Sequence, residues 1–232
     1  MLHFEHQLRG GRVAHLRFSD ASDADFAIAD SSGQLAAART SLCGYRWTWL
    51  HQVHGAEVVE VTQPGEGAAS HADACFTAID RAVVAVQTAD CAPVLFVGDN
   101  GMVGAAHAGW RGAVAGVLPA TVAAMRANDC GDLTAIIGPT IGAECYEFGE
   151  TDLAEAVAAL GDTVPATTSA GTPALDLTAG IAAQLADLGV SATVIAECTA
   201  CDGKYHSHRA RADKGRQVAA AWIDSRPAEV SA

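Results

Sequence analysis

Short β-rich segments alternate with Ala-rich or amphipathic segments along this chain, and this alternation most limits the folds open to it. Polar and apolar residues alternate over 12–18, which is typical of a strand. Apolar residues recur at helical spacing over 112–128, which predicts a helix there. The other predicted strands cover 46–53, 57–62, 82–87, 93–97, 133–138, 190–197, 204–209 and 217–223, and the other predicted helices cover 33–43, 152–160 and 178–188.

The predicted strands are linked in two ways. Asp99-Asn100-Gly101 is a strong turn signal between two apolar runs, so it predicts a hairpin of 93–98 with 102–107. Other consecutive strands, such as 102–107 and 133–138, are separated by a predicted helix. Hairpins combined with helical crossovers favour a mixed sheet covered by helices. Because the chain has no repeat and no clear linker, we interpret residues 1–232 as a single α/β domain.

The charge of the chain limits its partners. Fourteen Lys and Arg face 27 Asp and Glu, which gives a net charge of −13. Nucleic acids and anionic membranes both need a basic surface, so neither is an expected partner. The one dense basic stretch, 204–216, is interpreted as a solvated loop in preference to a site for a small anion. No apolar run is long enough to span a bilayer and the N-terminus has no apolar leader, so we expect a cytoplasmic protein.

The chain has seven cysteines. An odd number without a secretion signal argues against a disulfide framework, so most are expected to be buried thiols. Cys198 and Cys201 form a single Cys-x-x-Cys pair. A zinc ribbon needs a second such pair, and a thioredoxin-like pair opens a helix, so we interpret these two as thiols at a strand end.

Three residues, His54, Cys91 and His107, lie where predicted strands end or break. Sites in α/β folds gather at such ends. Two imidazoles and a thiolate suit zinc, and three protein ligands leave the fourth tetrahedral position open, which is the catalytic pattern. Their spacing matches no compact metal motif, so a turn histidine, a buried thiol and a core histidine are the alternative interpretation.

Other histidines are less favoured as ligands. His51 is three residues from His54, and residues three apart in a strand point to opposite faces. His206 and His208 would share one face of a strand and are interpreted as half-exposed. Residues 109–112 precede a helix, so Arg111 and free backbone N–H groups there are candidates for binding an anion.

Several ordered segments together resemble a known family. HQVHG, DACF, TADCAPVLF, AAHAGWRG, IGPTIGAECYEFGE and the C-terminal CTAC and SHR lie between residues 46 and 223. They resemble the laccase-domain family, also called multicopper polyphenol oxidase-like, purine nucleoside phosphorylase or peptidoglycan editing factor. The resemblance implies an α/β/β/α sandwich with one zinc ion per chain, held by His54, Cys91 and His107. It also implies phosphorolysis of adenosine, inosine, guanosine and methylthioadenosine, and deamination of adenosine.

The resemblance suggests roles for further residues. Zinc lowers the pKa of bound water to roughly 7, which makes hydroxide available for deamination, with Asp90 as a candidate proton carrier. Arg111 and Arg209 are candidates for holding phosphate. The C-terminal arginines depart from the family pattern, so which of them takes that role stays open. Cys145 is interpreted either as lining the catalytic pocket or as a buried thiol.

The expected enzyme is therefore a purine nucleoside phosphorylase and adenosine deaminase whose partners are a small nucleoside and phosphate. Three alternatives use the same residues: a hydrolase of peptidoglycan precursors, a copper-dependent polyphenol oxidase, and a non-catalytic metal-binding protein. A multicopper cluster needs many His-x-His pairs, and this chain has nine histidines but one such pair. Copper is therefore less favoured than zinc.

Overall fold

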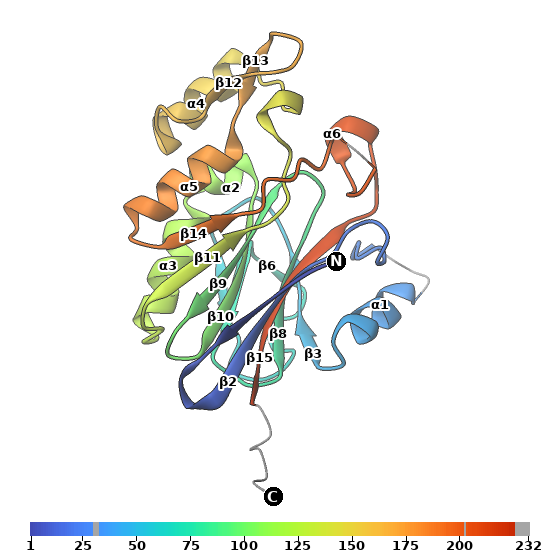
Figure 1. Ribbon diagram of the computed structural model, residues 1–232, viewed down its shortest axis with the longest axis vertical. Coiled ribbons are helices and arrows are strands. Elements are labelled where there is room, and N and C mark those ends of the chain that lie inside the picture. The colour runs from blue at the N-terminus through green and yellow to red at the C-terminus, as the bar shows by residue number, and fades with distance from the viewer. Residues whose placement is uncertain (30–32, 202, 226–232) are drawn as a thin grey trace, which may run out of the picture.

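The computed structural model describes residues 1–29, 33–201 and 203–225, and most of its strands form two sheets (Figure 1). The five-stranded sheet has the order β1 (Leu2–Gln7), β2 (Arg12–Phe18), β15 (Gln217–Ser225), β8 (Ala82–Thr88) and β3 (Arg46–Thr48). The six-stranded sheet has the order β14 (Ser191–Val194), β11 (Leu133–Ile137), β9 (Ala92–Gly98), β10 (Met102–Ala108), β7 (Ala74–Thr77) and β5 (Val58–Glu60). Two further pairs are β4 (Leu50–His51) with β6 (Ser70–His71), and β12 (Pro165–Thr167) with β13 (Pro173–Leu175).

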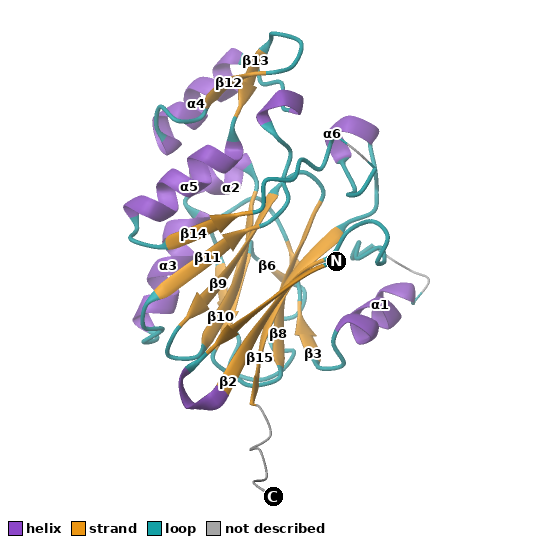
Figure 2. Ribbon diagram, viewed as in Figure 1, coloured by secondary structure: helices purple, strands orange, loops and turns teal. Residues whose placement is uncertain are grey.

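Helices lie on both outer sides of the paired sheets (Figure 2). The six-stranded sheet is covered by α2 (Trp110–Ala115), α3 (Val117–Ala127), α4 (Glu150–Leu160) and α5 (Leu177–Asp187). The five-stranded sheet is covered by α1 (Gln34–Leu42). The short elements are α6 (His208–Arg211) and two 3₁₀ turns, η1 (Arg9–Gly11) and η2 (Ala143–Cys145). No helix within the described ranges is both long enough and apolar enough to cross a membrane.

Three apolar cores separate these layers. The central core joins side chains of both sheets, including Leu16 and Val84 from one and Leu95 and Val103 from the other. A second core lies under α2–α5, and a third lies under α1. Both faces of each central strand are thus buried, which explains the continuous apolar runs of β8 and β9. The layers form the α/β/β/α sandwich that the family resemblance implied.

The predicted hairpin is confirmed. β9 and β10 pair antiparallel from Met102↔Gly98 to Ala108↔Ala92. The turn is closed by a hydrogen bond of 2.9 Å from the N–H of Gly101 to the carbonyl of Gly98. Gly101 has a φ of 94°, a conformation that glycine adopts without strain. This register determines which residues lie together at the end of the hairpin opposite the turn.

Two predicted elements are interrupted. The helix predicted over 112–128 is two helices, because Gly116 between α2 and α3 has a φ of 90°. The strand predicted over 46–53 is likewise two short strands, β3 and β4, that join different sheets. The strand β1 was not predicted, although Leu2 and Phe4 alternate with polar residues there.

The strand predicted over 204–209 is wrong. This segment forms turns followed by α6, whose first backbone N–H groups are capped by Ser207: its hydroxyl accepts from the N–H of Ala210 at 3.1 Å. Arg211 bonds the backbone carbonyls of Thr199 and Tyr205. These contacts hold the segment against the loop at Thr199 instead of in a strand ladder. The N–H of Arg209 donates to Asp90, so the segment passes beside the turn between β8 and β9.

Candidate metal centre

The hairpin register brings Cys91 and His107 to one end of the six-stranded sheet. Ala92 pairs with Ala108, so Cys91 lies just beyond that pair. On the other side of β10, Ala106 pairs with Ala74, and the backbone N–H of His107 donates to the carbonyl of Asp73 at 2.7 Å. Cys91 also lies in the short turn from β8 to β9, where the chain passes from one sheet to the other.

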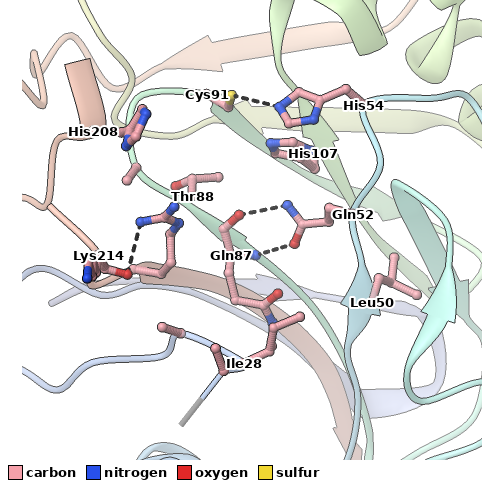
Figure 3. Close-up of a pocket in the computed structure, with 14 residues that line it drawn as sticks. Ile28, Leu50, Gln52, His54, Gln87, Thr88, Cys91, His107, His208 and Lys214 are labelled. Atoms are coloured by element: carbon pink, nitrogen blue, oxygen red, sulfur yellow. Dashed lines mark hydrogen bonds between the residues drawn. The ribbon is translucent and has the colours of Figure 1, made fainter. Parts of the chain in front are cut away.

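His54 completes the group from a separate loop after β4 (Figure 3). Its Nε2 lies 3.8 Å from Cys91 Sγ, and its ring centroid lies 4.8 Å from that of His107. One donor atom from each residue lies within 4.8 Å of the other two. Ligands about 2.0–2.3 Å from a tetrahedral zinc ion lie roughly 3.3–3.8 Å apart, so the separation of His54 Nε2 and Cys91 Sγ matches zinc, and the two imidazoles and the thiol are donors that zinc prefers. His107 is buried and His54 is exposed, which leaves one side of the group open.

Asp73 organises both histidines. Its fully buried carboxylate accepts hydrogen bonds from the backbone N–H groups of Val53, His54 and Gly55 at 2.8–3.1 Å. It also accepts a hydrogen bond from Nδ1 of His107 at 2.9 Å. A protonated Nδ1 leaves the Nε2 lone pair of His107 free for a metal, which is the usual carboxylate–histidine–metal arrangement. Burial alone would raise the pKa of Asp73, but these hydrogen bonds outweigh it and lower the pKa.

The charges around Cys91 favour its thiolate. Burial alone would raise the pKa of Cys91, but the His107 and His54 imidazoles outweigh it and lower the pKa to about 6. Burial alone would lower the pKa of His107, but the Cys91 thiolate and the Asp73 carboxylate raise it to about 9. A metal needs the thiolate as ligand, so the group holds Cys91 in the form that binds, while metal binding has to displace the Nε2 proton of His107.

Gly109 allows the close approach of these ligands. It precedes α2, and a Cβ atom at this position would lie 2.8 Å from both Cys91 Sγ and His54 Cδ2. Its φ of −68° is ordinary, so the requirement for glycine is one of space and not of backbone conformation. Any side chain here would displace two of the three candidate ligands.

Asp90 holds the turn before Cys91. Its carboxylate accepts from the Thr199 hydroxyl at 2.7 Å and from the N–H of Arg209 at 2.6 Å. Its backbone carbonyl accepts from the Thr140 hydroxyl and from the N–H of Ile141. Asp90 is 7% exposed and has a φ of 91°. The carboxylate thus holds two segments, at Thr199 and Arg209, and the backbone carbonyl holds a third, at Thr140 and Ile141.

A cavity of about 450 Å³ opens beside the candidate ligands (Figure 3). Ligand cavities usually measure ~300–1,000 Å³. The side chain of Gln52 holds one edge of it by two hydrogen bonds with the backbone of Gln87, at 2.7 and 2.8 Å. The hydroxyl of Thr88 is buried and has no hydrogen-bond partner in the described part of the chain. The lining residues are Ala27, Ile28, Ala29, Leu50, Gln52, His54, Gln87, Thr88, Ala89, Cys91, His107, His208, Lys214 and Arg216.

Arg111 and Arg209 lie outside this cavity, on aromatic side chains. The guanidinium of Arg111 stands 4.3 Å over the ring of Trp110, and that of Arg209 stands 4.8 Å over the ring of Tyr146. Phe148 links the two rings, with centroid distances of 5.2 Å to Trp110 and 5.1 Å to Tyr146. Arg209 also donates to the carbonyl of Glu147 at 2.8 Å. Both arginines are exposed, and their guanidinium groups lie over one continuous aromatic surface formed by Trp110, Phe148 and Tyr146.

Tyr146 connects this aromatic surface to the candidate ligands. Burial raises the pKa of Tyr146, and the nearby Cys91 thiolate raises it further, while Arg209 and Arg111 oppose the rise. The phenol is therefore protonated at neutral pH, and the charges of both the thiolate and the two guanidinium groups act on it.

Comparison with known proteins shows which family the chain belongs to. The family described as multi-copper polyphenol oxidoreductase laccase matches residues 8–224. The chain belongs to this family. A Mycobacterium tuberculosis (strain H37Rv) protein named purine nucleoside phosphorylase is 41% identical over 202 residues, which cover 85% of this chain and 80% of that protein. A Streptomyces griseus protein with the same name is 38% identical over 236 residues, covering 96% and 94%. A crystal structure of a Neisseria meningitidis protein matches with a TM-score of 0.81 and 26% identity, covering 96% and 98%.

The family membership confirms the resemblance seen in the sequence, and the structure shows where the remaining candidates lie. Cys145 does not line the cavity; its Sγ lies 3.6 Å from that of Cys201. His51 packs on the ring of His71 and not on the candidate ligands. His208, predicted on a strand, begins α6 and lines the cavity. Asp73 and Tyr146 were not chosen from the sequence, although DACF and IGAECYEF, the segments that contain them, stood out there.

Proposed function

We propose that this protein is a zinc-dependent purine nucleoside phosphorylase. The observation that carries the proposal is the open group of His54, Cys91 and His107 at the wall of a cavity large enough for a nucleoside. The names of the M. tuberculosis and S. griseus relatives support a nucleoside-phosphorylase-like enzyme. Zinc bound to these three residues would supply a Lewis acid with one free coordination position.

The cavity offers suitable contacts for a purine nucleoside. Ile28 and Leu50 provide apolar surface for the flat base, and the unpartnered hydroxyl of Thr88 provides a hydrogen bond. His208 lines the same cavity from the start of α6. We assign it as the hydrogen-bond donor to the purine as the base leaves.

Phosphate needs a separate cationic position close to the sugar. Arg111 and Arg209 lie outside the cavity but act, together with Cys91, on Tyr146, and we assign them this role. Each guanidinium is held on an aromatic ring, so little side-chain freedom is lost when it binds an anion. In phosphorolysis a phosphate oxygen bonds to C1′ of the ribose while the bond from C1′ to the purine nitrogen breaks. The electron pair of that bond leaves with the purine, where hydrogen-bond donors stabilise it.

Deamination of adenosine is a second activity proposed for the same centre. The open coordination side of the three ligands favours it, since attack on C6 of adenine needs a water bound close to the base. Because both carboxylate oxygens of Asp90 are engaged, we assign His208 and not Asp90 as the proton carrier.

The decisive experiment incubates zinc-loaded protein with adenosine, with and without phosphate. Phosphorolysis gives adenine and ribose 1-phosphate only when phosphate is present, and deamination gives inosine in both cases. Arg111→Gln and Arg209→Gln should each raise the KM for phosphate about tenfold, which is the loss of about 1.4 kcal/mol of binding. Arg126→Gln on α3 is the matched control, because this arginine is likewise exposed and does not line the cavity, but it bonds the carbonyl of Leu188. Formation of neither product would overturn the proposal.

The alternatives predict different results in parallel assays. A peptidoglycan-editing hydrolase would act on cell-wall precursors and not on nucleosides. An oxidase would bind more than one copper per chain and oxidise a polyphenol. A non-catalytic protein would bind the metal with no turnover. The cytoplasmic location and the absence of nucleic-acid and membrane partners stay predictions from the sequence.

A further inference from the structure

A second group of metal-binding side chains lies away from the catalytic candidates. Glu144 and Cys145 come from η2, and Cys198 and Cys201 come from the loop that follows β14. One donor atom from each of the four lies within 4.8 Å of the other three. Cys145 Sγ lies 3.6 Å from Cys201 Sγ, and the Cys201 thiol donates to a carboxylate oxygen of Glu144 at 3.2 Å.

These separations match a tetrahedral metal site. Two sulfur ligands about 2.3 Å from a zinc ion lie roughly 3.8 Å apart, and a sulfur and an oxygen ligand lie roughly 3.5 Å apart. A disulfide would need a sulfur–sulfur distance of about 2.05 Å, and it would use two of the three sulfurs. The spacing Cys198-x-x-Cys201 is typical of zinc ligands, and Cys145 with Glu144 supplies the second half that the sequence lacked.

The types of donor in the group also suit a divalent cation. Three thiols and one carboxylate converge, and each can supply a negatively charged ligand atom. The backbone N–H of Gly142 donates to Cys198 Sγ at 3.1 Å and holds that sulfur in place. The donor set and its separations therefore favour a metal ion such as zinc at this group.

We propose that Glu144, Cys145, Cys198 and Cys201 bind a second zinc ion, which is structural. Four protein ligands fill the tetrahedron and leave no position for substrate. Binding displaces protons from the thiols, while Glu144 coordinates as the carboxylate. The proposal is independent of the reaction at the first centre.

The second ion would clamp two segments that both hold Asp90. Thr140 pairs with Cys198 in an isolated bridge, and its hydroxyl donates to the carbonyl of Asp90. Thr199, next to Cys198, donates to the Asp90 carboxylate. The residues after Cys145 carry Tyr146 and the carbonyl that holds Arg209. Loss of the ion would therefore loosen the wall beside Cys91 without removing any catalytic ligand.

Metal content tests the proposal. The full-length protein, purified with zinc and freed of loosely bound metal, should contain two zinc ions per chain by mass spectrometry of the metal. Cys201→Ser should reduce this to one, and so should Cys91→Ala, while the double variant should hold none. Glu144→Gln, which keeps all three thiols, should bind the second zinc more weakly in competition with a chelator. Glu147→Gln is the matched control, since this exposed side chain is three residues away and outside the group.

Two results would overturn the proposal. The first is one zinc ion per wild-type chain together with an unchanged zinc content in Cys201→Ser. The second is a Cys145–Cys201 disulfide, found by peptide mapping, in protein that fails to take up a second zinc after reduction. If Cys201→Ser does not fold, the chelator competition with Glu144→Gln decides, because an unchanged affinity contradicts a role as ligand.

Discussion

Cys91 and Cys201 each belong to a group of side chains whose donor atoms lie within 4.8 Å of one another, but their neighbours carry opposite charges. Cys91 faces two imidazoles, and its pKa is lowered to about 6. Cys201 faces a carboxylate and two other thiols, and its pKa is raised. In the first group the imidazoles already stabilise the Cys91 thiolate to which a metal would bind. In the second group a metal would have to displace the protons of the thiols.

The difference in charge matches a difference in ligand number. The His54 group has three ligands and one exposed side, which suits catalysis. The Glu144 group has four ligands, which suits a closed structural site. The buried Asp73 carboxylate fixes the first group through four hydrogen bonds, whereas the second group joins the loop after β14 to a 3₁₀ turn. Variants in the two groups should therefore fail in different ways.

The largest difference is expected between Cys91→Ala and Cys201→Ala. Cys91→Ala removes a ligand from the open centre, so kcat/KM for phosphorolysis should fall at least about a thousandfold, or about 4 kcal/mol in transition-state stabilisation. Cys201→Ala should stay within about tenfold of the wild type and should instead lower the unfolding temperature. Steady-state kinetics and a thermal scan of both variants measure the contrast. Equal losses of activity would show that the two groups are not separate in function.

A second contrast tests space at the open centre without touching a ligand. Gly109→Ala places a Cβ 2.8 Å from Cys91 Sγ and His54 Cδ2, so it should lower kcat/KM about a hundredfold, or about 2.7 kcal/mol. Gly149→Ala is a close control, because Gly149 also precedes a helix in extended conformation and a Cβ there meets no atom within 4 Å. It should be nearly neutral. Normal activity and zinc content in Gly109→Ala would mean that the ligands lie farther apart than we describe.

Asp73→Asn tests whether the first group depends on its organising carboxylate. An amide cannot accept hydrogen bonds from all four donors now facing Asp73, and one of them is Nδ1 of His107. Zinc affinity at this centre should fall about 10–100-fold, the usual effect of losing such a partner. Competition with a chelator measures it, using the Cys201→Ser variant so that only one centre is occupied. An unchanged affinity would argue that the backbone alone orients His107.

The sequence predicted the hairpin that builds the first centre. The turn 99–101 fixes a register in which Cys91 and His107 reach the same end of the sheet. Local turn chemistry decides this, and local chemistry can be read from a sequence. The partner Asp73 comes from a different strand, and its pairing with β10 depends on sheet order, which no local signal gives. The motif DACF marked the segment but not the role of the residue.

The second group was missed for the same physical reason. Cys145 and Cys201 meet because β11 and β14 are parallel neighbours, so the loops that follow these two strands begin side by side. The sequence shows one Cys-x-x-Cys pair and a cysteine far from it, and their meeting depends on tertiary packing. The strand predicted over 204–209 also gave no reason to expect this contact, since the segment in fact forms turns and α6, and Arg211 bonds the carbonyl of Thr199 next to Cys198. Strand and helix periodicity thus located most of the cores but could not place this loop.

The smallest expected effect is a difference between Cys91 and Cys201 in how their alkylation rates depend on pH, measured on metal-free protein. Thiolates react with iodoacetamide and thiols do not, so the rate follows the ionised fraction. With a pKa of about 6, Cys91 should keep about half of its maximal rate at pH 6 and about a tenth at pH 5. Cys201, whose pKa is raised, should react only at alkaline pH. Peptide mapping gives both rates, and zinc should protect both thiols. A rate for Cys91 that rises only above pH 8 would contradict the stabilisation of its thiolate by His107 and would make the two groups electrostatically alike.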